Sequence, residues 1–243
     1  MGKKIIRVIA VVLIPVVCLY LLTLLLTPKY VNDIPEGSMI AEYYKSEKNN
    51  DVLILGDCEV YENISTVKMW EEYGIRSYIR GSSEQLIWQS YYLLEDTLKH
   101  ETPKVVVLSM LAMSEADAKS EAYNRMTLDG MRWSKSKWNS IKESMTEKET
   151  MGSYIFPLLR YHSRWSELSS DDIKYMFNKP KVTSNGYLMQ VGVRPVTTVP
   201  KVSPLANYTF SDRNYEYLDK IKDLCNEKGI KLVLIKAPSI FPH

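Results

Sequence analysis

The chain begins with an apolar stretch that constrains where the rest of the protein can fold. No charged residue occurs from Val8 to Leu26. As a helix rising about 1.5 Å per residue, this stretch spans roughly 28 Å, about the thickness of one bilayer hydrocarbon core. The sequence therefore predicts a transmembrane anchor over residues 8–27. The basic residues of 1–7 predict that these remain cytoplasmic, so that the rest of the chain lies outside the cytoplasm.

A cleaved signal peptide is the alternative reading of this stretch. Its apolar region would be shorter, and small residues would follow it at a cleavage site. Here the run ends in "LLLTPKYV", which contains no A-x-A-like site. An uncleaved anchor is therefore favoured. It predicts a single-pass protein of the plasma membrane, which binds the membrane through its N-terminal helix.

Charge and motifs exclude several functions. The chain has 31 basic and 29 acidic residues, and three of the basic residues precede the anchor, so the remainder is nearly neutral. This balance gives no support to a nucleic-acid partner. The sequence contains no metal-ligand spacing, phosphate-binding loop or dinucleotide fingerprint, so we expect no metal and no cofactor.

Beyond a polar stalk at 28–50, apolar strands alternate with amphipathic helices. A β-α-β-α-β order predicts an α/β domain over 51–243, with a flavodoxin-like, three-layer parallel sheet. The predicted strands lie near 52–56, 75–80, 104–111 and 230–236, and the predicted helices between them near 65–73, 83–100 and 212–228.

One long segment interrupts this alternation. Residues 114–180 look helical and irregular, and residues 182–200 suggest a hairpin or an extended flap. A segment this long is too large for a plain connection, which predicts a functional insertion or a subdomain over 114–200.

In open α/β sheets, ligands bind beyond the carboxyl ends of the strands. Two predicted strands end there in glycine loops, Gly56–Glu59 and Gly81–Ser83. Cys58 stands at the tip of the first loop. A thiolate is a strong nucleophile, and the N-terminus of a following helix would lower the pKa of the thiol, whereas neighbouring carboxylates would raise it. The alternative is a buried structural thiol.

Three segments in this order, "LILGDCEVYENIS", "YIRGSSEQ" and "PKVVVLSML", resemble the SGNH or GDSL-like hydrolase superfamily. The resemblance is to its membrane-anchored bacterial branch, which includes teichoic-acid D-alanyl transfer proteins. It implies that Cys58 occupies the position of the nucleophilic Ser. It also implies that the backbone N–H groups of Cys58 and Gly81 bind the oxyanion.

Glu59, Ser82 and Ser83 in these loops each allow two interpretations. Glu59 could orient the thiol or bind a cationic group of the substrate, or it is a solvated turn carboxylate. Ser82 and Ser83 could contact substrate, or they cap the next helix.

The sequence departs from the family pattern in three ways. A Cys replaces the Ser, and "VLSMLAMSEAD" has no Asn to donate to the oxyanion. The family's Asp-x-x-His pair is also absent, because Ile240 lies three residues before His243, His100 ends a helix and His162 lies in the insertion. We therefore expect the domain to be incomplete at its C-terminal end.

Two classes of function follow. One is an enzyme for acyl transfer or ester hydrolysis on a cell-envelope glycan or lipid. The other is a catalytically inactive, membrane-tethered binding or assembly factor of the same fold. Trp133, Trp138 and Trp165 are interleaved with basic residues, which would suit an anionic envelope polymer. Alternatively, these tryptophans pack on the sheet and leave a solvated basic face. The sequence identifies neither the substrate nor the oligomeric state.

Overall fold

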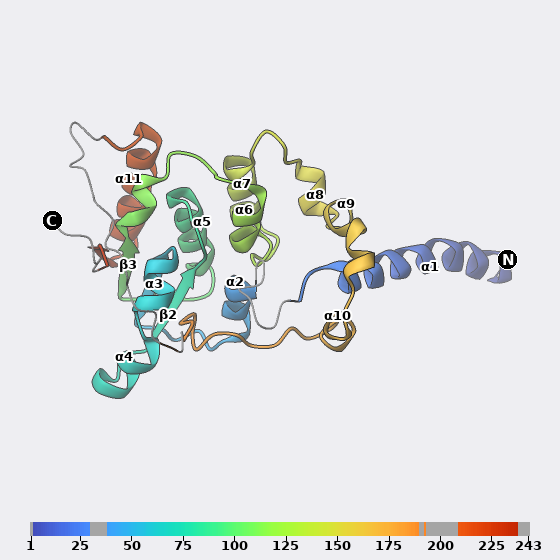
Figure 1. Ribbon diagram of the computed structural model, residues 1–243, viewed down its shortest axis with the longest axis horizontal. Coiled ribbons are helices and arrows are strands. Elements are labelled where there is room, and N and C mark those ends of the chain that lie inside the picture. The colour runs from blue at the N-terminus through green and yellow to red at the C-terminus, as the bar shows by residue number, and fades with distance from the viewer. Residues whose placement is uncertain (1, 30–37, 190–191, 193–208, 238–243) are drawn as a thin grey trace. The chain divides into compact units, whose positions relative to one another are not determined.

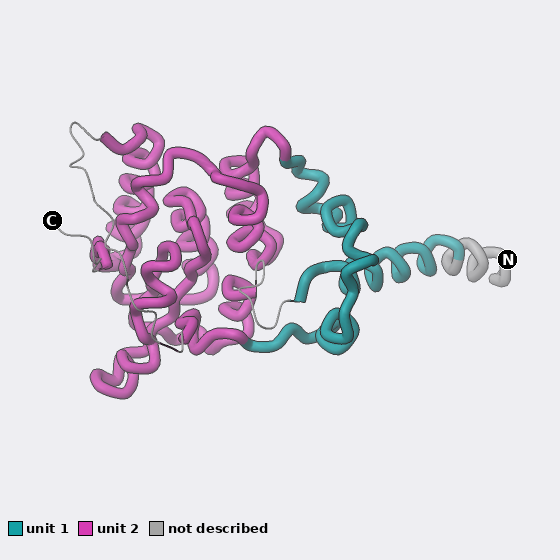
Figure 2. The backbone as a smooth tube through the Cα atoms, in the orientation of Figure 1, with its two compact units in different colours: residues 1–35, 149–181 teal, residues 36–148, 182–243 magenta. Residues whose placement is uncertain are grey.

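The computed structural model describes residues 2–29, 38–189, 192 and 209–237, with side chains from residue 11 onward. The chain divides into two compact units, which Figure 2 distinguishes by colour. Unit 1 comprises residues 1–35 and 149–181, and unit 2 comprises residues 36–148 and 182–243. The two segments of each unit are therefore separated in the sequence.

Unit 2 contains a parallel sheet (Figure 1). Its four strands run in the order β2-β1-β3-β4, and every neighbouring pair is parallel. This arrangement is compatible with a flavodoxin-like fold, whose strand order begins 2-1-3-4. The parallel α/β sheet predicted from the alternation is confirmed, with the strands at Val52–Gly56 (β1), Ser77–Gly81 (β2), Val105–Ser109 (β3) and Lys231–Ile235 (β4).

Helices of unit 2 connect and cover these strands. The predicted helix after β1 is confirmed as α4, where the Ser65 hydroxyl caps the first turn and Gly74 ends the helix at φ +65°. The helices of this unit are α2 (Ser38–Glu42), η1 (Tyr43–Lys45), α3 (Cys58–Asn63), α4 (Thr66–Tyr73), α5 (Ile87–Thr97), η2 (Met110–Ser114), α6 (Glu121–Leu128), α7 (Lys135–Ser144) and α11 (Asp212–Glu227), with η marking 3₁₀ helices.

The core lies between the sheet and its helices. All five residues of β1 are buried, which explains the continuous apolar run in its sequence. Helices α5 and α11 pack together through aromatic rings, and the hydroxyls of Tyr92 and Tyr217 lie 3.3 Å apart. Strand β4 is covered less than the others, with Val233 and Leu234 exposed.

Three predicted boundaries differ from the structure. Residues 38–45, expected in a polar stalk, form α2 and η1, where Ile40 and Tyr43 are fully buried. Strand β3 ends at Ser109 rather than at Leu111, because η2 begins at Met110. The expected insertion is divided, since residues 114–148 belong to unit 2 and residues 149–181 to unit 1.

The start of the expected flap folds against β2. Asn185 and Gly186 both have positive φ, 50° and 82°, as in the type I′ turns that favour Asn-Gly. The carbonyl of Asn185 accepts a hydrogen bond from the N–H of Ile79, at 3.0 Å. The hairpin turn is thus present at 184–187, whereas residues 193–200 of the expected flap lie outside the described residues.

All regular elements among the described residues of unit 1 are helices. They are α1 (Gly2–Leu26), α8 (Met151–Ile155), α9 (Leu158–Tyr161), η3 (His162–Glu167) and α10 (Ser170–Lys174). The Asp172 carboxylate caps α10, since it accepts a hydrogen bond from the N–H of Ser169 at 2.9 Å. Over the residues whose side chains the structure describes, which in α1 begin at residue 11, no helix has the length and apolar character needed to cross a membrane.

Candidate functional site at the carboxyl edge of the sheet

The site begins where β1 ends, at Gly56. This glycine has φ +150°, and a Cβ atom there would lie only 2.5 Å from the Cβ of Ser109 on β3. In the β1–β2 pair, Gly56 is in register with Gly81, where a Cβ would lie 2.9 Å from the Gly56 carbonyl oxygen. Both glycines are therefore required by close approach, and they bring the ends of three strands together.

Cys58 is the first residue of α3, two residues after Gly56. Asp57 caps this helix, because its Oδ1 accepts the N–H of Glu59 at 3.0 Å. The sequence predicted a loop over Gly56–Glu59, and the structure shows instead that α3 begins directly at Cys58. The thiol is free and half-buried.

The loop after β2 holds the two candidate serines differently. The N–H of Ser82 donates to the Gly56 carbonyl at 3.3 Å, which ties this loop to the end of β1. The Ser82 side chain is buried, and its hydroxyl bonds the hydroxyl of Thr127 at 2.5 Å. The hydroxyl of Ser83 bonds that of Tyr61 in α3 at 2.7 Å. Ser83 is therefore joined to the helix that carries Cys58, whereas the Ser82 hydroxyl is directed to the interior.

Buried hydrogen bonds continue from Ser82 towards α7. Thr127 donates to the side chain of Gln89, and Gln89 donates to Asn124 and to Ser144. All of these side chains are buried. Because each buried polar group has a partner, the network fixes the loop after β2 to α5, α6 and α7.

Glu59 links the ends of β3 and β4. One carboxylate oxygen accepts from the Ser109 hydroxyl at 3.4 Å, and the other pairs with the ammonium of Lys236. Lys236 directly follows β4, so the strand order 1-3-4 is what brings it to Glu59. Glu59 is thus not simply a solvated turn carboxylate, because its carboxylate is mostly buried and each of its two oxygens has a partner.

The surroundings of Cys58 disfavour the thiolate. Burial raises the pKa of the thiol to about 11, and the negative charges of Asp57, Glu62 and Glu84 act in the same direction. Reactive cysteines normally have the opposite environment, with a lowered pKa and neighbouring cations. In this conformation the thiol is therefore almost entirely protonated at neutral pH.

Asp57 responds to the same desolvation. Burial raises the pKa of its carboxyl to about 6, against the hydrogen bond from the Glu59 N–H, which favours the charged form. The charges of Glu59 and Glu84 raise it further. Neutral pH thus leaves a buried negative charge next to Cys58.

Of the described histidines, His100 lies outside this loop cluster and His162 belongs to the other unit. His100 follows α5 and packs against the rings of Tyr43 and Tyr44, at centroid distances of 6.4 and 5.9 Å. His162 begins η3 in unit 1 and is exposed. His243 lies outside the described residues. No group of His, Cys, Asp and Glu side chains suited to a metal ion occurs within the described ranges.

The three tryptophans of the expected polymer-binding surface are all exposed. The exposed fractions are 51% for Trp133, 42% for Trp138 and 72% for Trp165. Trp133 and Trp138 belong to unit 2, and Trp165 to unit 1. They therefore do not form a single surface that the structure defines.

Two contributions to the site were missed from the sequence. Lys236 was read only as the end of a strand, although a basic residue directly after an apolar strand is a signal for the carboxyl edge. Asn214 of α11 was also missed, and its Nδ2 donates to the carbonyls of Met113 and Glu115, at 2.7 and 3.0 Å, in the loop after β3.

In comparisons with known proteins, no family model matches the chain, and no curated protein is significantly similar to it.

Proposed function

We propose that this protein is a membrane-anchored, extracytoplasmic protein of SGNH-like, three-layer architecture. We further propose that it acts in acyl transfer or ester hydrolysis on a cell-envelope glycan or lipid, with Cys58 as the nucleophile. The Cys58 sulfur would attack the ester carbonyl carbon, forming a thioester and releasing the alcohol, which takes up a proton. Water or a second alcohol would then attack the thioester and regenerate the thiol.

One observation carries this proposal. Cys58 lies two residues beyond Gly56, and Gly56 is in register with Gly81 at the carboxyl edge of a parallel sheet. The resemblance to the superfamily assigns the nucleophile to Cys58 and the oxyanion donors to the backbone N–H groups of Cys58 and Gly81. Backbone N–H groups next to an acyl group would stabilise the negative oxygen of its tetrahedral intermediate.

A different observation favours a second candidate, a catalytically inactive binding or assembly factor. The pKa of Cys58 is raised to about 11, mainly by burial and then by neighbouring carboxylates. Without a base, loss of general acid–base catalysis typically costs about 10²–10⁴-fold in rate. Under this alternative the loop cluster binds an envelope component, and Cys58 packs as a small apolar residue.

The proposed membrane location rests on the N-terminal sequence. The uncharged run begins at Val8, follows Lys3, Lys4 and Arg7, and lies within α1. Within the described side chains of this helix, residues 11–22 are exposed and are nearly all apolar. A bilayer would cover such a surface, and the basic residues would keep the other end of the helix cytoplasmic.

Acylation of the whole chain by a p-nitrophenyl ester separates the two candidates. The protein is held in lipid nanodiscs, and the acyl adduct is located by mass spectrometry while p-nitrophenolate release is followed. An enzyme should form an adduct at Cys58 and turn over, and Cys58→Ala should abolish both. Cys225→Ala is the matched control, because Cys225 is fully buried in unit 2. An adduct without turnover, or no adduct at Cys58, would favour the binding factor.

A further inference from the structure

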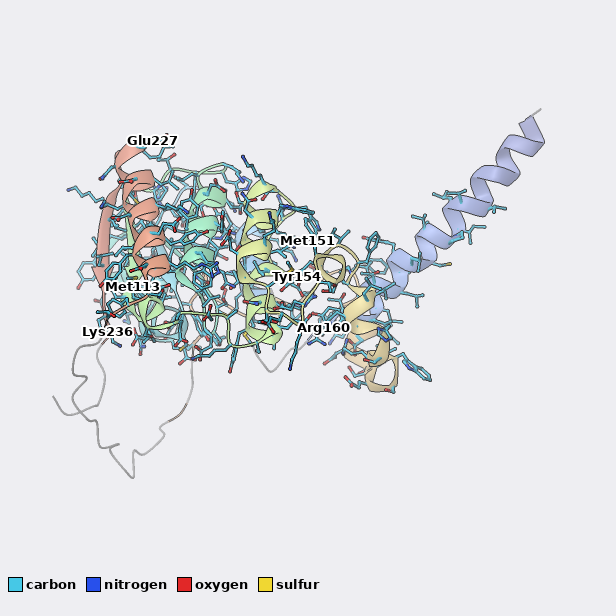
Figure 3. All side chains as sticks on the ribbon, turned by 90° about the horizontal axis from the view of Figure 1, so that it is seen from above. Met113, Met151, Tyr154, Arg160, Glu227 and Lys236 are labelled. Carbon is cyan, nitrogen blue, oxygen red and sulfur yellow. The ribbon has the colours of Figure 1, made fainter. Side chains whose placement is uncertain are left out.

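The exposed apolar surface of α1 ends before the helix does. Its side chains are exposed from Val11 to Leu22, whereas Thr23 to Leu25 are half-buried and Leu26 is only 6% exposed. Within unit 1, α9, η3 and α10 contact α1. Figure 3 shows this end of the chain with the short helices against α1. We call the segment that contains these helices, residues 151–177, the collar.

Polar contacts fix the collar to the helix end. The guanidinium of Arg164 in η3 donates to the carbonyl of Leu26 at 2.5 Å and also to the Asp172 carboxylate in α10, at 3.2 Å. The ammonium of Lys29 donates to the carbonyl of Leu25 at 3.2 Å and lies 4.0 Å from Asp172. These contacts satisfy terminal carbonyls of α1, which a helix leaves without intrahelical partners.

The collar carries large apolar side chains on its outside. We define the collar patch as Ile155, Phe156, Leu159, Trp165, Ile173 and Phe177, whose exposed fractions range from 41% to 76%. All six belong to residues 149–181 of unit 1, the same unit as α1. Exposed apolar residues are thus dense in one short segment, as is expected where a protein meets a membrane or another partner.

The charges of this segment give no preference for an ionic partner. Residues 149–181 contain five basic and four acidic residues, so their net charge is close to zero. Some basic groups lie against aromatic rings, with the Arg160 guanidinium 5.6 Å from the Tyr161 ring centroid and the Lys174 ammonium 4.8 Å from that of Tyr175. Aromatic rings and long basic side chains of this kind are typical of the interface between lipid and water.

We propose that the collar patch lies in the interfacial layer of a lipid bilayer, around the point where α1 leaves the hydrocarbon core. This inference rests on the membrane anchor of the proposed function. The occupant is lipid because α9, η3 and α10, which carry Leu159, Trp165 and Ile173 of the patch, contact the anchor helix α1 within one unit, and because the near-neutral charge of the segment gives no preference for an anionic partner. The short helices would then lie on the membrane, in the manner of interfacial amphipathic segments.

Photolabelling from within the bilayer tests this inference. The whole chain is reconstituted into phosphatidylcholine vesicles that contain a phospholipid with a diazirine near the top of its acyl chain. After irradiation, labelled peptides are mapped by mass spectrometry. We expect label in α1 and in residues 151–177. In contrast, no label is expected around Trp70 and Tyr73 of α4, which are 57% and 72% exposed in unit 2.

Matched variants make the outcomes distinct. The triple change Phe156→Ser, Trp165→Ser, Phe177→Ser should abolish labelling of 151–177 and leave α1 labelled, whereas Trp70→Ser with Tyr73→Ser should change nothing. Because the three patch side chains are exposed, these changes should leave the circular dichroism spectrum unaltered. Label in α1 but not in the wild-type collar would refute the inference and preserve the anchor. Label in neither would refute the anchor itself, and with it this proposal.

Discussion

Cys58 combines a position that suits attack on a carbonyl with an environment that keeps its proton. The sulfur lies at the carboxyl edge of the sheet, where parallel sheets bind ligands. Its burial and three neighbouring carboxylates hold the pKa at about 11. A bound cation or a basic group would have to lower this value before the thiol could act at neutral pH. This requirement is the chemical difference between the two candidate functions.

The reaction of Cys58 with iodoacetamide should therefore depend steeply on pH. Only the thiolate is alkylated, so the rate should rise about tenfold per pH unit between pH 7 and 10. The measurement is mass spectrometry of the Cys58 peptide over time, with the fully buried Cys225 as an internal control that stays unmodified while the fold is intact. A rate that reaches its plateau below pH 8 would contradict this, and would indicate an activated thiol.

Asp57→Asn should stabilise the protein at high pH. Asn keeps the cap of α3, and it removes a carboxyl whose pKa burial raises to about 6. A raised pKa contributes stability that is present below the ordinary pKa near 4 and is lost as pH rises through 6. The melting temperature should thus increase by about 2–4 °C at pH 8 and by much less at pH 4. Thermal unfolding followed by near-UV circular dichroism measures both.

The control for this prediction is a carboxyl whose pKa is shifted in the opposite direction. Asp51 has its pKa lowered by a hydrogen bond from Lys104, which lies 2.8 Å away. Asp51→Asn should therefore not raise the melting temperature at pH 8. If both variants were stabilised equally, a general effect of net charge would explain the result, and the specific role of Asp57 burial would be wrong. The same Asp57→Asn change should also lower the pKa of Cys58, which the iodoacetamide profile can detect.

At the scale of elements, the sequence predicted the strands and helices that are marked by a clear apolar run or a helical repeat of apolar residues. The strands are continuous apolar runs, and they were located to within about two residues. Helix α3 was missed because its six residues, "CEVYEN", are too few to show a helical period, and Asp57 as its cap was read as part of a turn. Helix α2 was missed for a different reason, because only tertiary burial of Ile40 distinguishes it from a polar stalk.

The candidate site likewise has one part that the sequence could predict and one part that it could not. The approach of the Gly56 and Gly81 loops could be predicted, because consecutive strands of a βαβ unit usually lie close together. The pairing of Glu59 with Ser109 and Lys236 could not, because it depends on which strands neighbour β1 and β3. Strand order is a property of the packed sheet, and no local pattern in this sequence encodes it.

The Asn185-Gly186 turn offers a direct test of how the edge of β2 is covered. A Cβ on Gly186 would lie 1.9 Å from the carbonyl oxygen of Ile79, whereas a Cβ on Gly74 would have no neighbour within 4 Å. Both glycines have positive φ. Gly74→Ala should thus cost about 1–2 kcal/mol from backbone strain alone. Gly186→Ala should cost more, above about 3 kcal/mol, because a backbone clash is added.

Denaturant unfolding of the whole chain compares the two glycine variants. The difference between them isolates the clash, since the conformational penalty is shared. Equal losses of stability would mean that the turn does not pack on β2 in solution. A hydrogen-exchange measurement provides a second readout, because the Ile79 N–H is bonded to Asn185 and should exchange faster in Gly186→Ala only.

At the scale of the whole molecule, the proposal requires that the chain crosses the membrane once, with residues 28–243 outside. Protease added to intact cells should therefore remove the domain, while a cytoplasmic marker protein stays intact. The physical reason is that Lys3, Lys4 and Arg7 precede the uncharged run and are retained on the cytoplasmic side. Changing all three to Glu leaves the apolar run unaltered and removes this bias, so a protected, inverted fraction should appear. Complete protection of the wild-type domain would exclude the topology, and an unchanged orientation in the triple variant would show that these charges do not determine it.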